Sequence, residues 1–340
     1  MKKIALWNLQ VFLLLVSLLT QCLSHVEQAA PAPGQVSELT VRFVDVGQGD
    51  CTLITCDGEA MLIDAGNNDQ GAKIRLYLQQ QDVHTLKYVI GTHPDADHIG
   101  GLDVILYHFD CGTIILPDRS ADHAAYRDVI DTMRQKDYKN TVPVTGDVYT
   151  LGSASFTILG PSGDYEDTND CSVCILLRHG NRSFLFTGDA EAKAEQDMAE
   201  SGHVLDVDVY KAGHHGSSTS SGDALLKACT PEYAVISCGE GNPYGHPHEE
   251  TLERLQAMGI QVYRTDEQGT ITVTSDGKNL LWDFGPSAPV AYVLNTNTYK
   301  FHLPDCPSVK DMNEKNKVES DAGRDEIIGW GYAPCKRCRP

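Results

Sequence analysis

A six-residue segment, His93-Pro94-Asp95-Ala96-Asp97-His98, constrains this chain more than any other feature of its sequence. The segment follows an apolar run at 86–90 and precedes Gly100-Gly101. The apolar run predicts a short buried strand, so the segment should lie on a loop at a strand end, where sheet proteins commonly place their sites. Two imidazoles and two carboxylates so close together lose hydration and repel one another unless a cation offsets their charge. The segment therefore predicts one or two bound metal ions.

Three further apolar runs end in residues that bind metals. The run at 61–63 ends in Asp64, the run at 184–187 in Gly188-Asp189, and the run at 207–211 in Gly213-His214-His215-Gly216. A single strand followed by Gly-Asp indicates only a turn. Four such strand ends in order along the chain indicate that their side chains converge on one metal site.

The pattern of apolar residues predicts a large domain at 38–285 and a small one at 292–340, joined by a linker at 286–291. Helical periodicity favours helices near 70–81, 101–109, 121–137, 190–201, 220–229 and 248–258. Strands are expected near 40–46, 51–55, 60–63, 86–90, 113–116, 154–159, 172–178, 182–187, 206–211, 233–237, 261–264 and 270–275. Strand-rich stretches interleaved with single helices predict an α/β fold, in which two packed sheets are covered by helices on both outer faces.

The beginning of the chain predicts export. Met1-Lys2-Lys3 and the apolar stretch at 11–19 are typical of a signal peptide, which we place at 1–24, followed by a linker at 25–37. Cys22 is a candidate for a lipid anchor. No other segment reaches the roughly 20 apolar residues that a membrane span requires. We therefore expect a secreted or cell-surface protein without a transmembrane domain, and no obligate protein partner is evident.

The formal net charge of −20 bears on the substrate. An acidic surface repels nucleic acid, so the charge argues against tight, processive binding of DNA. It does not argue against hydrolysis of a phosphodiester that diffuses to a metal site, because bound cations offset the charge locally.

The motifs in their order resemble the metallo-β-lactamase superfamily, and more closely the hydrolase domain of ComEC-type competence proteins. The resemblance covers residues 39–283 and implies the αββα sandwich of that superfamily. The matching stretches are Asp-Val-Gly-Gln-Gly-Asp at 45–50, Thr-His-Pro-Asp-Ala-Asp-His-Ile-Gly-Gly at 92–101, Gly188-Asp189, His-His-Gly-Ser at 214–217 and Asn-Pro-Tyr-Gly-His-Pro at 242–247.

The resemblance also implies a ligand set for two metal ions. His93 and Asp95 would hold the first ion, Asp97 and His98 the second, and Asp189 would bridge them. One of His214 and His215 would be the late histidine ligand, and we favour His215 because it directly precedes glycine.

The chain departs from the wider superfamily in two places. Asp95 stands where a histidine is usual, and the region of the expected middle histidine holds Asn169 or Asp170 as a candidate ligand. Both departures replace imidazole by oxygen donors, which shift the preference from zinc toward manganese or magnesium. We therefore expect two divalent ions, Mn²⁺ or Zn²⁺, at the active site.

Roles for the surrounding residues follow from the same resemblance. Asp97 would ligate a metal and orient the attacking hydroxide, and His246 is a candidate leaving-group acid or phosphate contact, with a structural role as the alternative. Asp64 is more readily structural than a ligand. The remaining residues expected to brace the site from behind are Asp45, Gln48 and Asp50.

The C-terminal segment carries four soft metal ligands in two close pairs, His302 with Cys306 and Cys335 with Cys338. This number and spacing predict a closed structural zinc site, which would stabilise a segment too short for a large core. The arrangement is similar to the zinc-binding module of the Ada DNA-repair protein, with His302 in place of its first cysteine. Lys336, Arg337 and Arg339 permit DNA binding but equally fit a solvated end.

The leading hypothesis is an exported dinuclear metal-dependent hydrolase that cleaves phosphodiesters, with DNA as the substrate that the resemblance favours. ComEC-type proteins join this domain to a membrane channel, which this sequence lacks, so we expect a secreted nuclease rather than a DNA importer. The alternatives are a phosphodiesterase acting on cell-wall or phosphocholine substrates and a non-catalytic protein that binds DNA through the zinc tail. A lactamase is disfavoured because of Asp95 and the absent middle histidine.

Overall fold

The computed structural model describes residues 37–203, 206–285, 292–304, 306–320, 322, 324–338 and 340. The expected signal peptide, Cys22, all but the last residue of the linker at 25–37, and the linker at 286–291 lie outside these residues. Among the residues described, no helix is both long and apolar enough to cross a membrane.

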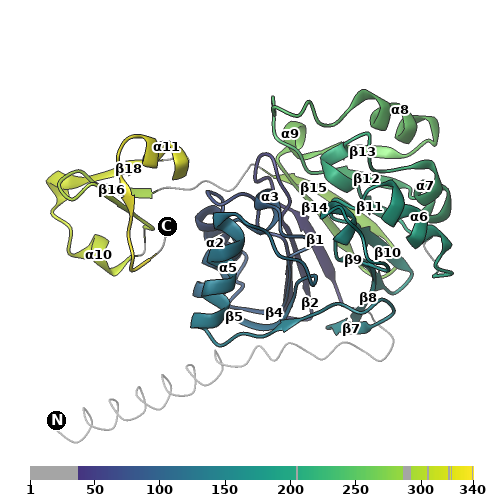
Figure 1. Ribbon diagram of the computed structural model, residues 1–340, viewed down its shortest axis with the longest axis horizontal. Helices are drawn as coiled ribbons and strands as arrows, with labels where there is room; N and C mark the ends of the chain where they lie inside the picture. The colour runs from purple at the N-terminus through teal and green to yellow at the C-terminus, as the bar shows by residue number, and fades with distance from the viewer. Residues whose placement is uncertain are drawn as a thin grey trace, which may run out of the picture. The chain divides into compact units, whose positions relative to one another are not determined.

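Two mixed β-sheets form the body of the large domain (Figure 1). The first sheet has the order β15 (Leu280–Gly285), β14 (Thr270–Ser275), β1 (Leu39–Phe43), β2 (Thr52–Cys56), β3 (Glu59–Ile63), β4 (Thr85–Ile90), β5 (Asp110–Ile115) and β6 (Asn140–Thr141). The second has the order β13 (Gln261–Arg264), β12 (Tyr233–Ile236), β11 (Val209–Lys211), β10 (Arg182–Phe186), β9 (Cys174–His179), β8 (Ala154–Gly160) and β7 (Val148–Leu151).

The inner faces of the two sheets share one apolar core. Phe43 and Met61 of the first sheet and Phe156, Leu177 and Phe184 of the second are each fully buried in it. Each such side chain stabilises the fold by roughly 1.5–3 kcal/mol relative to exposure. This shared core holds the ends of the two sheets in register, which is what brings their loops together.

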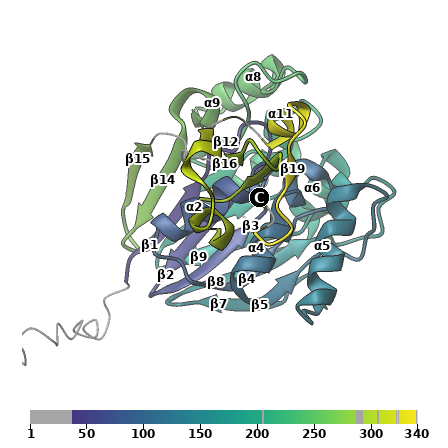
Figure 2. The ribbon, with the colours of Figure 1, turned by 90° about the vertical axis from the view of Figure 1, so that its left-hand side faces the viewer.

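Helices cover the outer face of each sheet, as predicted. Figure 2 shows α2 (Gly71–Gln80), α4 (Leu102–His108) and α5 (Ala124–Gln135) over the strands of the first sheet. The second sheet is covered by α6 (Ala192–Glu200), α7 (Asp223–Cys229) and α8 (Glu249–Ala257). In α5, Ala125, Val129 and Met133 are buried at four-residue intervals, which places them on one face of the helix. The αββα sandwich is therefore confirmed.

The structure corrects several predicted boundaries. The strand expected over 40–46 ends at Phe43, because the chain turns through Gly47 and Gly49, whose φ angles are +71° and +141°. The strand expected over 172–178 begins at Cys174, after a 3₁₀ turn, η1 (Asn169–Cys171). The strand expected over 206–211 is the three-residue β11. No apolar pattern predicted β6, β7, β15 or the short helix α9 (Thr265–Gln268).

Strand direction explains why the metal-binding motifs meet. β3, β4 and β5 are parallel neighbours in the first sheet, and β10, β11 and β12 are parallel neighbours in the second. Parallel strands end at the same edge of a sheet, so the loops after them gather there.

The C-terminal segment has its own small sheet and core. Its sheet has the order β18 (Lys317–Ser320), β16 (Tyr292–Asn295), β17 (Lys300–His302) and β19 (Ala333–Pro334). Its short helical elements are α10 (Pro307–Lys310), η3 (Glu314–Asn316) and α11 (Arg324–Gly329). Tyr292, Phe301 and Ile327 are buried in a core that includes the three cysteines of the segment.

Candidate metal centre

His98 is held by a carboxylate from the neighbouring strand end. It lies in the short helix α3 (Ala96–Ile99) and is fully buried. Its Nδ1 atom lies 2.8 Å from Oδ2 of Asp64, and the backbone N–H of Thr92 donates to Oδ1 of Asp64 over 2.8 Å. A carboxylate bound to one ring nitrogen fixes the imidazole so that the other nitrogen faces the site. Asp64 thus contacts His98 at the ring nitrogen opposite to the one that faces Asp189.

His93 presents a lone pair into the same space. The hydroxyl of Thr92 donates to Asp64 over 2.7 Å, so its oxygen accepts from Nδ1–H of His93, 3.1 Å away. Nε2 of His93 is therefore the acceptor nitrogen, and it is buried with no hydrogen-bond partner among the described residues. It lies 3.9 Å from Oδ2 of Asp95 and 4.0 Å from Oδ2 of Asp189. A buried, unpartnered nitrogen between two carboxylates is what a metal ligand requires.

His214 and His215 point in different directions from the 3₁₀ turn η2 (Gly213–Gly216). Both have left-handed backbones, with φ of 50° and 53°. Nδ1 of the buried His215 lies 2.9 Å from the carbonyl oxygen of Ser237, and its Nε2 lies 3.3 Å from Oδ2 of Asp97. The partly exposed His214 places Nδ1 3.2 Å from Oε1 of Glu191. Each imidazole is thus oriented by a separate oxygen.

Asp189 lies between all four histidines. Its Oδ1 is 3.1 Å from Nε2 of His98, and its Oδ2 is 3.6 Å from Nε2 of His215. The same Oδ2 is 3.7 Å from Nε2 of His214. Two ligands bound tetrahedrally to one ion at about 2.1 Å lie about 3.4 Å apart. The carboxylate therefore has the spacing needed to join two metal sites.

Asp50 is the fourth member of a buried group with His98, Asp189 and His215, whose ligand atoms all lie within 4.8 Å of one another. Its Oδ2 lies 2.9 Å from Nζ of Lys211, and its Oδ1 lies 3.2 Å from Nδ1 of His215. Lys211 is only 2% exposed. Lys211 was not among the predicted site residues, although a lysine at the end of an apolar strand is a signal for a buried ion pair.

The site stays charged without a metal because its groups compensate one another. Burial alone would raise the pKa of Asp97, but His215 and His98 lower it to about 2. Burial would lower the pKa of His215, but Asp189 and Asp50 raise it to about 10. Metal ions bind neutral imidazole, so a cation bound at Nε2 of His215 would displace the proton of that ring.

The comparisons with known proteins agree with this geometry. Residues 44–240 match the family model described as "Metallo-beta-lactamase superfamily". The chain belongs to this superfamily. It is therefore a metal-dependent hydrolase of metallo-β-lactamase fold, and the family implies divalent ions at the group of histidines and carboxylates described above.

Three relatives of this metallo-β-lactamase superfamily member have names that refer to the ComE operon, to recombination and to competence. "ComE operon protein 3" of Bacillus subtilis is 30% identical over 69% of this chain and 33% of its own length. "Recombination protein 2" of Haemophilus influenzae is 34% identical over 68% and 28%, respectively. "Competence protein ComA" of Neisseria gonorrhoeae is 30% identical over 75% and 34%. The match thus spans about a third of the length of each relative.

The region of the missing middle histidine contacts the candidate metal centre only through other side chains and the backbone. Nδ2 of Asn169 donates to Oε1 of Glu191 over 3.4 Å, and this carboxylate orients His214. Oδ1 of Asp170 accepts from the backbone N–H groups of Glu191 and Ala194, at the start of α6. The sequence analysis did not single out Glu191, which no motif marks.

The loop at 45–50 packs against the segment at 93–98. A Cβ atom on Gly49 would lie 2.4 Å from the carbonyl oxygen of Asp97, so this close approach requires glycine. Oε1 of Gln48 accepts from the backbone N–H of Gly239, which ties the loop to the second sheet. Oδ1 of Asp45 accepts from the N–H of Gly47. These contacts brace the loop rather than bind a metal.

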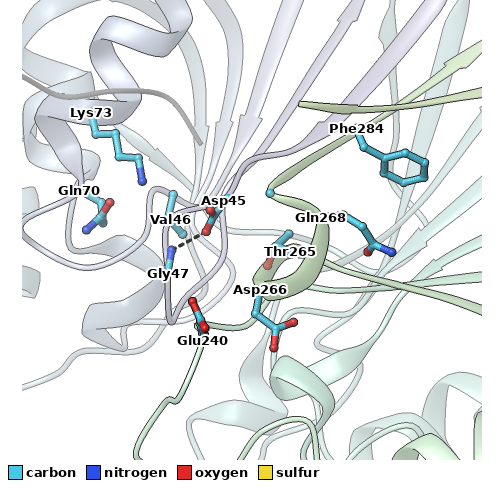
Figure 3. A pocket seen from close by; sticks show the side chains of 11 residues that line it. Asp45, Val46, Gly47, Gln70, Lys73, Glu240, Thr265, Asp266, Gln268 and Phe284 are labelled. Atoms are coloured by element: carbon cyan, nitrogen blue, oxygen red, sulfur yellow. Dashed lines mark hydrogen bonds between the residues drawn. The ribbon is translucent and has the colours of Figure 1, made fainter. Parts of the chain in front are cut away.

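Asp45 also lines an open pocket of about 660 Å³. Figure 3 shows Lys73 on one side of this pocket and Asp266 on the other, with Asp45 and Glu240 between them. Its acidic lining does not suit the phosphate groups of a substrate.

His246 lies beside the two late histidines. Its ring centroid is 5.5 Å from that of His214 and 6.3 Å from that of His215. The side chain is half-buried, and its Nδ1 atom has no hydrogen-bond partner among the described residues. Burial, followed by the neighbouring imidazoles, lowers the pKa of His246 to about 4.

The C-terminal segment contains a second group of potential metal ligands. The ligand atoms of His302, Cys306, Cys335 and Cys338 lie within 4.8 Å of one another, and all four residues are buried. The backbone N–H of Arg337 donates to Sγ of Cys335 over 3.4 Å. Burial would raise the pKa of Cys335, but backbone N–H groups lower it, which favours the thiolate that binds metals.

Proposed function

We propose that the protein is a secreted, dinuclear hydrolase that cleaves phosphodiesters and that its substrate is DNA. The observation that carries the proposal is the unpartnered Nε2 of His93 facing the carboxylates of Asp95 and Asp189. It supports a complete first metal site in which an aspartate replaces a histidine. The names of the relatives support DNA as the substrate. Because this chain matches only about a third of each relative, the activity of the whole relatives is a proposal for this chain.

The proposed ligands form two sets that share one bridge. The first set is His93, Asp95 and His214, and the second is Asp97, His98 and His215, with Asp189 common to both. In this assignment both late histidines are ligands, and His214 fills the place of the missing middle histidine. Glu191 supports it, because a histidine that ligates through Nε2 is commonly oriented by a carboxylate at Nδ1.

The donor atoms favour hard cations. The first set has two carboxylates and two imidazoles, and it is open to solvent at Asp95, whose side chain is 46% exposed. Oxygen-rich sites suit manganese and magnesium better than do sites of three imidazoles. We propose Mn²⁺ as an active metal alongside Zn²⁺.

Two divalent ions in such a site supply an activated water and neutralise the charge that develops on phosphorus. The protein contributes the positions of the reacting groups. Oδ2 of Asp97, near Nε2 of His215, is placed to accept a hydrogen bond from the attacking water. The imidazole of His246, whose ring centroid lies 5.5 Å from that of His214, is near enough to the proposed metal site to contact a phosphate oxygen or the leaving group.

We propose that the C-terminal group binds one structural zinc ion, as in the Ada-like module that the sequence resembles. Three sulfur atoms and one imidazole match a closed zinc site. With few fully buried apolar side chains, the segment depends on such an ion for stability.

One assay separates the candidate activities. Purified protein, stripped of metal and reloaded with Mn²⁺ or Zn²⁺, is tested on single-stranded DNA, bis-p-nitrophenyl phosphate, glycerophosphocholine and a chromogenic lactam. We expect metal-dependent cleavage of the first two and its loss in Asp97→Ala. Absence of phosphodiester cleavage, or full activity of Asp97→Ala, refutes the proposal. Preference for glycerophosphocholine would favour the alternative that the acidic surface tolerates more easily.

A further inference from the structure

A row of near-parallel aromatic rings leads from the metal centre to the solvent. The ring of buried His215 and that of His246 have centroids 6.3 Å apart and an interplanar angle of 28°. The ring of Tyr244 continues the row, 5.6 Å beyond His246 at an angle of 26°. Tyr244 is 62% exposed. The row therefore has His215, a proposed metal ligand, at one end and the exposed ring of Tyr244 at the other.

The loop that carries Tyr244 is fixed by hydrogen bonds. Oδ1 of Asn242 accepts from the backbone N–H groups of Tyr244 and His246, over 3.2 and 3.0 Å. Nδ2 of Asn242 donates to the carbonyl oxygens of Gly239 and His246. The ring of His248 connects the backbones of Tyr244 and Ser218. Its Nε2 lies 3.2 Å from the carbonyl oxygen of Tyr244, and its Nδ1 accepts from the N–H of Ser218. The backbone that carries the exposed ring is thus held in place before any ligand arrives.

We propose that Tyr244 is a stacking platform for a nucleobase of the substrate, next to the scissile phosphodiester. This inference rests on the proposed phosphodiesterase function and specifies its substrate class. A rigid, exposed ring in line with other rings offers its free face to a flat aromatic ligand. A quaternary ammonium such as choline is instead recognised by several rings that surround it. Tyr244 presents a single open face, so a base fits better.

The charge of the protein makes stacking the better source of affinity. With a formal net charge of −20, the protein gains little from general attraction to a polyphosphate chain. Stacking of a neutral base does not depend on charge and is tolerant of sequence. Binding should therefore involve a few nucleotides at the metal centre, with a weak dependence on salt.

The test compares an intact oligodeoxynucleotide with copies that carry one abasic nucleotide at each position around the cleavage site. We expect wild type to cut one of the abasic copies about tenfold less efficiently in kcat/KM, the scale of one base–aromatic stack. Tyr244→Ala should cut the intact strand with the same loss and gain nothing from the base at that position. Tyr244→Phe retains the ring and should behave as wild type. Tyr299→Ala, which removes a tyrosine that is 59% exposed in the C-terminal segment, is the matched control.

A binding measurement makes the outcome independent of turnover. The Asp97→Ala protein loaded with Mn²⁺ should quench a 2-aminopurine placed at the sensitive position, and Tyr244→Ala in that background should not. Equal cleavage of abasic and intact strands by wild type, or equal quenching with and without Tyr244, overturns the inference. So does a Tyr244→Ala loss confined to glycerophosphocholine. Quenching without cleavage of any phosphodiester would leave the platform standing while the proposed activity fails.

Discussion

The substitution Lys211→Met tests how the buried ion pair supports the metal centre. Lys211 is 2% and Asp50 6% exposed, and their charged atoms lie 2.9 Å apart. Removing one partner of a buried pair costs about 3–5 kcal/mol, and Asp50 keeps its contact with His215, which places the loss toward the lower end of that range. Nζ of Lys211 also donates to the carbonyl oxygen of Ala212, and loss of this bond adds about 1 kcal/mol. We therefore expect Lys211→Met to lower the free energy of unfolding by about 4 kcal/mol or more.

The double substitution Lys211→Met/Asp50→Asn isolates the pair from the packing of the lysine stem. Removing both charges leaves no unpaired ion, so the double variant should be more stable than Lys211→Met alone. The free energies come from urea unfolding of metal-stripped protein, followed by far-UV circular dichroism and fluorescence. Stripping the metal prevents ligand binding from entering the comparison. If the losses of Lys211→Met and of Asp50→Asn sum to the loss of the double variant within about 0.5 kcal/mol, the two side chains are not coupled and the reasoning fails.

Four further predictions concern the other groups of the molecule. Asp64→Asn should weaken metal binding about 10–100-fold, because His98 loses its orienting carboxylate. Calorimetric titration with metal measures the affinity, and Asp82→Asn, which changes an exposed aspartate, is the control. His214→Ala should reduce the metal centre from two ions to one by elemental analysis, whereas retention of two would remove His214 from the ligand set. Cys335→Ser should lose the zinc of the C-terminal segment and make that segment sensitive to protease, and a variant that stays resistant and zinc-free would contradict a structural ion. Burial raises the pKa of Glu195 from 4.5 to about 7. The stability that its protonated form contributes is therefore present below about pH 4.5 and is lost as the pH rises through 7. Over this range the urea midpoint of wild type should fall more than that of Glu195→Gln.

Most of the sandwich could be predicted because its strands and helices carry strong local patterns. β14 (Thr270–Ser275) and β13 (Gln261–Arg264) have the bounds expected from the sequence. The two-residue β6 and the partly exposed β7 have no comparable pattern, because strands this short bury too few side chains to mark a face. Predicted strand ends failed where the chain leaves the sheet for the site, as after Phe43, since site geometry there overrides apolar periodicity.

The sequence motifs marked most of the histidines and carboxylates that lie together in the candidate site, but not the residues that support them. His93 and His98 lie in one hexapeptide, whereas Lys211 meets Asp50 only because the two sheets pack together. Glu191 likewise meets His214 through the fold and not within a motif. A sequence reveals side chains that share a segment, while pairings across more than a hundred residues depend on the completed fold.

The division of the proposed ligands between the two sheets would give bound metal ions a mechanical role. His98 follows a strand of the first sheet, and Asp189, 91 residues later, follows a strand of the second. An ion bound by both acts as a reversible cross-link that closes a long loop, and such a link restricts the unfolded chain more than a short one does. At a free metal concentration 100 times the dissociation constant, binding adds about 2.7 kcal/mol to the stability of the fold. The supply of metal in the surroundings would then set how long the protein stays folded, as well as whether it can act.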